Sequence, residues 1–265
     1  MTVPFASILT SGVSVLLCAV LPLGLAIWYV ASRRGRFVNI LVGALCFFVG
    51  AMVLESLLHQ LVFHLVPTLP MMPLAYVLYG ALAAGVFEET ARFIGLHFLC
   101  KKPSGLWTGI GYGIGHGGIE ALLVAALPSV NSLLVLLQLR FAGADALLAA
   151  VPEAGREAAA AQLQAAAALS PLDFLPVGME RLITLCFHIS LSVLVWMVVT
   201  GRVRRLWLAG AILLHAGVDV GAVLYQLGIW RSLWLTELYV AVFTALTAAL
   251  VTLLFRRTAR QTAAG

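Results

Sequence analysis

Long apolar segments alternate with short polar or basic connections along most of the chain. Each segment is close to the roughly 20 residues that a helix needs to cross a hydrocarbon core of about 30 Å. The apolar residues run continuously and do not alternate with polar ones, which excludes the strands of a membrane barrel. The pattern predicts an all-α bundle of about seven transmembrane helices in a single domain, 1–265, with spans at about 8–30, 37–62, 74–100, 106–127, 176–200, 206–228 and 232–255.

One further apolar stretch, 129–150, is long enough to resemble a span. Counting it as one would place the basic sequence at 202–205 outside the cell, against the positive-inside rule. The Ala-rich stretch 153–169 has low complexity and few charges, as solvated helices do. We therefore expect 129–175 to form an external or interfacial helical segment without chemistry of its own.

The composition agrees with a membrane protein and excludes a soluble one. Apolar residues make up 62% of the 265 residues, charged residues make up 10%, and the mean hydropathy is +1.05. A soluble domain carries about 25% charged residues, so this chain has too few to cover a surface in water. The four cysteines stand singly without CxxC spacing, so neither a disulfide framework nor a thiolate zinc site is expected.

The basic residues are distributed asymmetrically between the two ends of the predicted spans. Of the 16 Lys and Arg residues, 11 lie in four segments without Asp or Glu, at 33–36, 101–102, 202–205 and 256–260. Cytoplasmic loops of membrane proteins carry such an excess of positive charge. We therefore expect the N-terminus outside and the C-terminus in the cytoplasm.

Ionisable residues occur within four predicted spans, where each costs about 2.5–3.5 kcal/mol on insertion scales. They are Glu88, Glu89 and Arg92 in the third span, His116 and Glu120 in the fourth, His188 in the fifth, and His215 and Asp219 in the sixth. Counted from the cytoplasmic ends of the spans at about 1.5 Å per residue, five of them lie roughly 14–20 Å deep. This shared depth predicts that four helices direct carboxylates and imidazoles at one buried point.

Local spacing supports a single site. Three pairs lie four positions apart and so share a helix face: Glu88 and Arg92, His116 and Glu120, and His215 and Asp219. Adjacent carboxylates in a medium of low dielectric oppose each other's ionisation, and Arg92 can keep one of them ionised. An ionised carboxylate beside a neutral one suits a base that activates water, while His215 held by Asp219 suits a donor to an oxyanion.

The fourth predicted span contains six glycines between positions 109 and 118. The run Gly113–Gly118 formally matches GxGxxG, but no strand precedes it and no βαβ unit surrounds it, so a dinucleotide site is not expected. Small residues four positions apart allow membrane helices to approach closely. These glycines are expected to bring His116 near a neighbouring backbone and to leave space for a substrate.

In these residues the chain resembles the YhfC family of intramembrane peptidases, which is related to the bacterial CPBP proteins, the CAAX prenyl endopeptidases and the PrsW proteases. The matching motifs cover about half of the chain and are Glu88-Glu89-x-x-Arg92, Gly115-His116-Gly-Gly-x-Glu120, Glu180-Arg181 followed by Phe187-His188, and His215-x-x-x-Asp219. The resemblance implies an intramembrane endopeptidase that cleaves a membrane-embedded or lipidated protein. It also implies a multi-pass protein of the bacterial cytoplasmic membrane. Its expected partners include the lipid bilayer, and no nucleic acid is expected among them.

The resemblance further implies roles for the residues of the third and fourth spans. Glu88 would activate the attacking water and share it with His116, while Glu89 and Arg92 would support that base. The arginine follows the second glutamate by three residues, where CAAX-type proteins usually have four, so its helix face differs.

The remaining candidate residues match the related families less uniformly. The pair His215 and Asp219 resembles the motif that stabilises the tetrahedral intermediate. Tyr112 stands where the related FxxxH motif has phenylalanine, and His188 has no secure counterpart, so it is interpreted as an additional ligand or proton donor. Glu120 completes the set of candidate catalytic residues.

Hydrolysis without a metal is the expected chemistry, with no cofactor, and a zinc ion is the alternative. Glutamate and histidine are ligand types that suit zinc, although the chain contains no HExxH motif. If a metal is present, the expected ligands are Glu89, His116, His188 and His215.

Two other functions remain open from the sequence. A proton- or cation-coupled transporter also uses carboxylates and histidines in the membrane, but it requires a polar path to both faces, whereas these residues gather at one depth. A noncatalytic maturation or immunity factor of the same fold would keep its role when Glu88 or His116 is replaced. Outside the candidate site, Glu55 and His59 lie four positions apart and are expected to form a structural pair.

Overall fold

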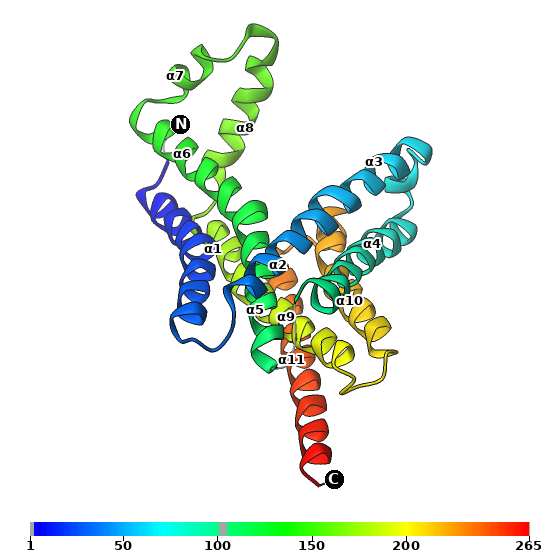
Figure 1. Ribbon diagram of the computed structural model, residues 1–265. Helices are drawn as coiled ribbons and strands as arrows, with labels where there is room; N and C mark the ends of the chain where they lie inside the picture. The colour runs from blue at the N-terminus through cyan, green and yellow to red at the C-terminus, as the bar shows by residue number, and fades with distance from the viewer. Residues whose placement is uncertain (1–2, 101–104, 265) are drawn as a thin grey trace. The chain divides into compact units, whose positions relative to one another are not determined.

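The computed structural model describes residues 3–100 and 105–264, and this part of the chain contains helices but no strand (Figure 1). The predicted all-α class is therefore confirmed. The basic connection expected at Lys101 and Lys102 lies outside the described residues.

Eleven α-helices are assigned among the described residues. In chain order they are α1 (Phe5–Ala31), α2 (Phe37–Phe47), α3 (Ser56–Leu65), α4 (Pro73–Ile94), α5 (Leu106–Glu120), α6 (Leu127–Phe141), α7 (Ala144–Ala149), α8 (Arg156–Ala168), α9 (Leu175–Val199), α10 (Trp207–Gln226) and α11 (Leu233–Ala264). Short 3₁₀ helices connect some of them: η2 (Leu69–Met71), η5 (Glu153–Gly155) and η6 (Pro171–Phe174).

Three π-helical segments directly continue an α-helix, and two of them join it to the next α-helix. They are η1 (Phe48–Glu55) between α2 and α3, η3 (Gly95–Leu99) after α4, and η4 (Ala121–Ala126) between α5 and α6. Such segments are rare in proteins and occur frequently at functional sites. Here they lie next to intramembrane polar residues, because η1 ends at Glu55 and η4 begins directly after Glu120.

Six helical segments in the described part of the chain are long and apolar enough to cross a membrane. They are Phe5–Ala31, Phe37–Leu65, Leu106–Phe141, Pro171–Val199, Trp207–Gln226 and Leu233–Gln261. The helix formed by α4 and η3 is of comparable length, but Glu88, Glu89 and Arg92 lower its hydropathy. With it, the fold agrees with the predicted bundle of about seven spans.

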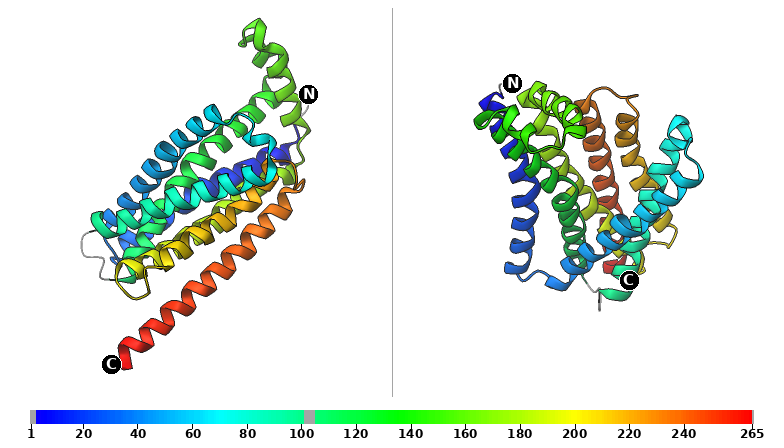
Figure 2. Two further views of the ribbon diagram at one scale, coloured as in Figure 1. Left: turned by 90° about the vertical axis from the view of Figure 1, so that its right-hand side faces the viewer. Right: turned by 90° about the horizontal axis from the view of Figure 1, so that it is seen from above.

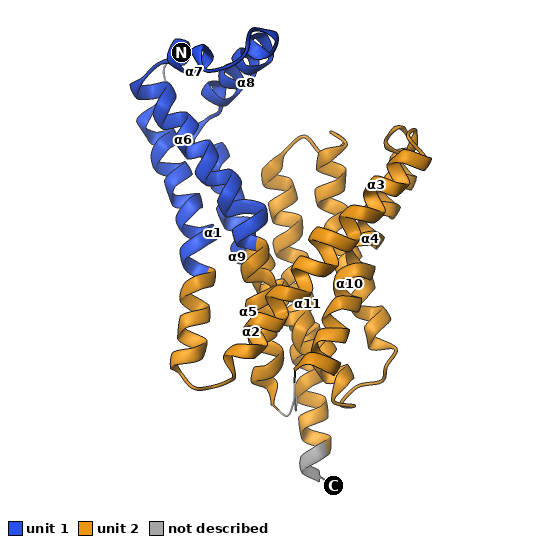
Figure 3. Cartoon of the chain, turned by 45° about the horizontal axis from the view of Figure 1, so that its top comes forward, with its two compact units in different colours: residues 1–21, 121–182 blue, residues 22–120, 183–265 orange. Residues whose placement is uncertain are grey.

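The chain divides into two compact units, shown in different colours in Figure 3. Unit 1 comprises Met1–Leu21 and Ala121–Leu182, and unit 2 comprises Pro22–Glu120 and Ile183–Gly265. The boundary falls inside continuous helices, so α1, α9 and the helix that runs from Leu106 to Phe141 contribute to both units.

Unit 1 contains the segment that the sequence places outside the membrane. The helix that begins at Leu106 continues through η4 and α6 to Phe141, beyond the predicted span end at 127, and α7 and α8 follow it. A small core of its own holds the unit together, with Val3, Ile8, Leu136, Leu139 and Phe174 buried. The start of the chain is tied to α6, because the guanidinium of Arg140 donates to the carbonyl oxygen of Val3 at 2.7 Å.

Unit 2 contains α2 to α5, the second part of α9, α10 and α11. In it α2 packs on α5, and α4 packs on α10, which also contacts α11. The main core lies among these helices and buries Leu96, Tyr112, Phe187, Leu191, Leu194 and Trp196. The C-terminal end of α11 extends past its neighbours in this unit (Figure 2), and it carries the exposed Arg256, Arg257 and Arg260.

Glycines in α5 allow the close packing that the sequence predicts. A Cβ atom at Gly115 would lie 2.0 Å from the carbonyl oxygen of Ile40 in α2, and one at Gly113 would lie 2.5 Å from the Cα of Ile189 in α9. Backbones of three helices therefore meet around α5, and only glycine fits at these contacts. This packing buries His116 completely.

Gly115→Ala is therefore expected to destabilise the bundle by about 1–3 kcal/mol, because its methyl group would overlap backbone that has no room to move. The measurement is the midpoint of thermal unfolding in detergent. Gly118→Ala is the matched control, since its Cβ would lie 3.4 Å from a side-chain carbon of Pro22, close to ordinary contact. Equal midpoints for the two variants would contradict the packing argument.

Candidate active site

The eight candidate residues of the sequence form one connected network inside unit 2. They come from α4 (Glu88, Glu89, Arg92), α5 (His116, Glu120), α9 (His188) and α10 (His215, Asp219). We call this set the polar cluster. The ring centroids of His116 and His188 are 4.8 Å apart, and those of His188 and His215 are 5.5 Å apart. The prediction that four helices direct these groups at one point agrees with this geometry.

Glu89 and Arg92 form a buried ion pair one helical turn apart. The Nε of Arg92 lies 2.9 Å and 3.1 Å from the two carboxylate oxygens of Glu89, and neither residue is exposed. The Nδ1 of His215 lies 2.7 Å from one of the same oxygens. Glu89 thus contacts Arg92 of its own helix and His215 of α10 and has no access to solvent. It is therefore suited to holding these two side chains in place.

Arg92 connects α4 to the histidines of two other helices. One terminal nitrogen of its guanidinium lies 3.3 Å from His116 Nε2 and 3.1 Å from His188 Nδ1, and the other donates to the carbonyl oxygen of His188. It also donates to the hydroxyl of Ser192, which itself donates to the carbonyl of His188 at 2.7 Å. Because a guanidinium only donates, Nδ1 of His188 is the acceptor of its contact, whereas Nε2 of His116 lies between Arg92 and the carboxylate of Glu88.

Ser192 is the member of this network that the sequence analysis did not identify. It is fully buried one helical turn after His188. The available signal was its spacing of four residues from His188 in an otherwise apolar segment. Serine is common in membrane helices as a packing residue. The spacing alone therefore does not show whether Ser192 hydrogen-bonds to Arg92 or only fills space between helices.

Glu88 occupies a different position from its neighbour Glu89. Its Oε2 lies 2.8 Å from His116 Nε2 and 3.6 Å from His215 Nε2. Its carboxylate also lines a cavity of about 400 Å³ together with Asp219, whereas Glu89 does not. Of the two adjacent glutamates, Glu88 is therefore the one that a substrate or a water molecule can reach.

The remaining two carboxylates each face a histidine of the cluster. Glu120 Oε2 lies 2.5 Å from His188 Nε2, which links α5 to α9. Asp219 Oδ2 lies 3.6 Å from His215 Nε2, and its side chain is about a third exposed. The sequence paired His116 with Glu120 on one face of α5, but the structure pairs Glu120 with His188 of another helix, since His116 is turned toward Glu88 and Arg92.

Two motifs named with the resemblance lie apart from these contacts. Glu180 and Arg181 form an ion pair with each other, and both belong to unit 1. Tyr112 is fully buried in α5, with its ring centroid 6.1 Å from that of His116, and its hydroxyl lies 3.4 Å from the carbonyl oxygen of Ala91. Tyr112 therefore supports the position of His116 without reaching the cavity.

One subset of the polar cluster has the arrangement of metal ligands. Glu88, His116 and His188 each offer one donor atom, and these three atoms lie within 4.8 Å of one another. One carboxylate and two imidazoles are the donor set of many catalytic zinc sites. His116 also has a buried Nδ1 with no hydrogen-bond partner among the described residues. The residues therefore fit a zinc ion.

This subset differs from the ligands expected from the sequence. Glu88 stands in place of Glu89, because both oxygens of Glu89 already contact Arg92. His215 is outside the subset, because its Nδ1 contacts Glu89. Sequence spacing alone could not separate two adjacent glutamates that project from α4 in different directions.

Comparison with known proteins identifies a family for the chain. The model of the family described as "YhfC intramembrane metalloprotease" matches residues 17–240. An "Uncharacterized membrane protein YhfC" of Bacillus subtilis (strain 168) is 34% identical over 230 residues, which cover 85% of this chain and 88% of the relative. No solved structure matches the chain significantly.

The family match spans all eight residues of the polar cluster, and the helices provide the spans of a multi-pass membrane protein. The relative is similar over nearly its whole length as well as that of this chain. Together with the motifs and their assembly at one point, these findings show that the chain belongs to the YhfC family of intramembrane metalloproteases.

Proposed function

We propose that the protein is an intramembrane endopeptidase in which Glu88 activates the water that attacks a peptide bond. The observation that carries the proposal is the different position of two adjacent glutamates. Glu89 is held by Arg92 and His215 without exposure, while Glu88 faces a cavity and contacts two imidazoles. A base has to reach its water, and Glu88 is the carboxylate of this pair that can do so.

In the proposed reaction, Glu88 takes a proton from a water molecule as its oxygen attacks the carbonyl carbon of the substrate. The C–N bond then breaks, and Glu88 returns the proton to the leaving nitrogen. His116 fixes the orientation of the Glu88 carboxylate through the contact of 2.8 Å. His215, held at Nδ1 by Glu89, presents its Nε2 beside Glu88 and, as an imidazolium, donates to the oxyanion that forms.

We further propose that one donor atom each of Glu88, His116 and His188 holds a zinc ion, which leaves the second carboxylate oxygen of Glu88 to act as the base. A zinc ion bound there would supply Lewis acidity that polarises the substrate carbonyl. Glu120 and Arg92 contact the two ring nitrogens of His188, so one of these contacts would give way to the ion and the other would orient the imidazole from outside the ligand set. Outer partners of this kind fix the direction in which a histidine ligand points.

Protein purified without chelators is accordingly expected to contain zinc, and His188→Ala is expected to lose most of it. The measurement is the metal content per protein by elemental analysis after extensive washing. Ser192→Ala is the control, because Ser192 contacts Arg92 but offers no donor of the set, and it should keep its zinc. Equal zinc content in wild type and both variants would contradict these ligands, whatever the catalytic activity.

The proposed function is tested by comparing protein N-termini in membranes from cells that contain the wild type or Glu88→Gln at equal expression. New N-termini present only with the wild type and located in membrane or lipidated proteins would support an endopeptidase and identify its substrates. Identical N-termini in both samples would overturn it, and would favour a transporter or a noncatalytic factor of the same fold.

A further inference from the structure

The cavity beside Glu88 extends well beyond the polar cluster. Its wall includes side chains from η1, α3, α4 and α10, and all of its lining residues belong to unit 2. The polar ones outside the polar cluster are Glu55, His59, Tyr76, Tyr79 and Gln226. We call this cavity the polar cleft.

Three of these residues form a hydrogen-bonded chain. His59 Nδ1 lies 2.6 Å from the hydroxyl of Tyr79, and His59 Nε2 lies 3.2 Å from a carboxylate oxygen of Glu55. When Tyr79 donates to Nδ1, a neutral imidazole donates from Nε2 to Glu55, so every contact has a donor and an acceptor. The expected pair of Glu55 and His59 is thus confirmed as a contact, but it lines a cavity shared with Glu88.

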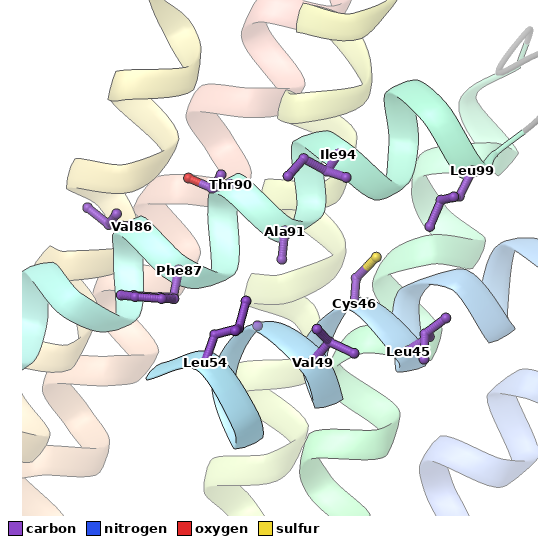
Figure 4. Close-up of a pocket in the computed structure, with 11 residues that line it drawn as sticks. Leu45, Cys46, Val49, Leu54, Val86, Phe87, Thr90, Ala91, Ile94 and Leu99 are labelled. Atoms are coloured by element: carbon purple, nitrogen blue, oxygen red, sulfur yellow. The ribbon is translucent and has the colours of Figure 1, made fainter. Parts of the chain in front are cut away.

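A second cavity, further along α4, is lined very differently. This cavity of about 360 Å³ lies between η1 and α4, and Figure 4 shows its apolar side chains, among them Leu54, Val86, Phe87 and Ile94. Ala84 and Glu88 of α4 line the polar cleft, whereas Ala91 lines this apolar groove. The one helix therefore borders a polar cavity in its earlier turns and an apolar one in its later turns.

A peptide bond can be cleaved only where the substrate backbone is accessible, so a helical segment must first unwind. An unwound segment in a membrane needs partners for its free N–H and C=O groups, because hydrocarbon provides none. The amide of Gln226 and the phenol oxygen of Tyr79 can provide them in the polar cleft, whereas the side chains of the apolar groove are hydrocarbon apart from Thr90 and Cys46.

We propose that the polar cleft binds an extended, unwound peptide segment of the substrate and is the route by which water reaches Glu88. Tyr79 and Gln226 contact the peptide backbone, and His59, held by Glu55 at 3.2 Å, fixes the orientation of the Tyr79 hydroxyl. A cavity of about 400 Å³ holds only a few residues, so these contacts lie close to the cleaved bond. This inference rests on the proposed function.

The water route is tested with single cysteines at two alanines of the same helix, after replacement of the four native cysteines by alanine. A charged, membrane-impermeant thiol reagent reacts with the thiolate, which forms only in contact with water. Ala84→Cys in the polar cleft is expected to react at least about tenfold faster than Ala91→Cys in the apolar groove. Equal rates, or a faster reaction of Ala91→Cys, would overturn the route, and neither result requires catalytic activity.

Peptide binding is tested with a synthetic peptide that spans a cleavage site found by the N-terminal comparison. Tyr79→Phe is expected to raise KM about tenfold at nearly unchanged kcat, because it removes a hydrogen bond to the bound peptide. Tyr225→Phe, a tyrosine of α10 that does not line the cleft, should change neither. The same peptide should slow labelling of the Ala84→Cys, Glu88→Gln protein.

These results separate the two proposals. Fast labelling of Ala84→Cys without any cleavage would retain the water route and overturn the proposed function. Cleavage with an unchanged KM for Tyr79→Phe and unslowed labelling would retain the proposed function and overturn the binding role of the cleft.

Discussion

Glu88→Gln is expected to reduce cleavage by about 10³-fold or more, because the amide cannot take a proton from water. The fold should survive, since glutamine has nearly the same shape and Glu88 faces a cavity, without the permanently charged partner that Glu89 has. Its contact with His116 can be replaced by a neutral hydrogen bond. This change therefore separates chemistry from stability more cleanly than any other in the polar cluster.

The measurement is the single-turnover rate of peptide cleavage by purified protein, with the unfolding midpoint recorded in the same detergent. Glu237→Gln is the control, because Glu237 is a buried carboxylate of α11 outside the polar cluster and the polar cleft. It should cleave at a rate near that of the wild type. A Glu88→Gln protein that is folded and retains the full rate would rule out Glu88 as the base.

The adjacent residue should behave in the opposite way, as a residue that stabilises the fold. Glu89→Gln leaves the buried guanidinium of Arg92 without its carboxylate, and Arg92→Met leaves the carboxylate of Glu89 with its contact to His215 alone. Removing one partner of a buried ion pair costs about 3–5 kcal/mol, because the other charge stays in a medium of low dielectric. Each single variant should therefore lower the free energy of unfolding strongly, while Glu88→Gln should not.

The double variant Glu89→Gln, Arg92→Met should be less destabilised than the sum of the two single variants, since no uncompensated charge remains. Denaturant unfolding of the four proteins in one detergent gives the coupling free energy directly. Strict additivity would show that the pair does not act as a unit, and would remove the distinction drawn between Glu88 and Glu89.

The fold was largely predictable because lipid imposes strong constraints on a chain. Continuous apolar segments of membrane length had to be helices, and their number followed from their lengths. The position of the helix ends was harder to predict. The segment from Leu106 to Phe141 is one uninterrupted helix, although charge asymmetry placed a span end near 127. Apolar composition alone does not tell where a helix leaves the membrane.

The candidate site was predictable in its members and less so in its contacts. Depth along each span brought Glu88, His116, His188 and His215 to one point, because residues at equal depth in a compact bundle become neighbours. The sequence could not predict that Glu120 contacts His188. That contact depends on the rotation of α5 and α9 about their axes, which the packing of Gly113 and its neighbours determines.

The expected zinc ligands show the same limit of prediction from sequence. Ligand types were readable from the sequence, but the choice between Glu88 and Glu89 depended on which carboxylate Arg92 engages. In the structure, the spacing of three positions places the guanidinium of Arg92 against Glu89 one turn away on α4, so Glu88 is left beside His116.

The π-helical segment η1 lets one membrane-crossing helix serve two neighbours that lie in different directions. Each turn of η1 contains more residues than an α-turn, so the residues after it are rotated relative to those of a regular helix. Gly43, before η1, fits against the backbone of α5, whereas His59, after it, reaches Tyr79 of α4. Deleting a single residue within Phe48–Glu55 would turn His59 by about 100° around the helix axis. The number of residues in η1 therefore sets the angle about the helix axis between the face that packs on α5 and the face that carries His59.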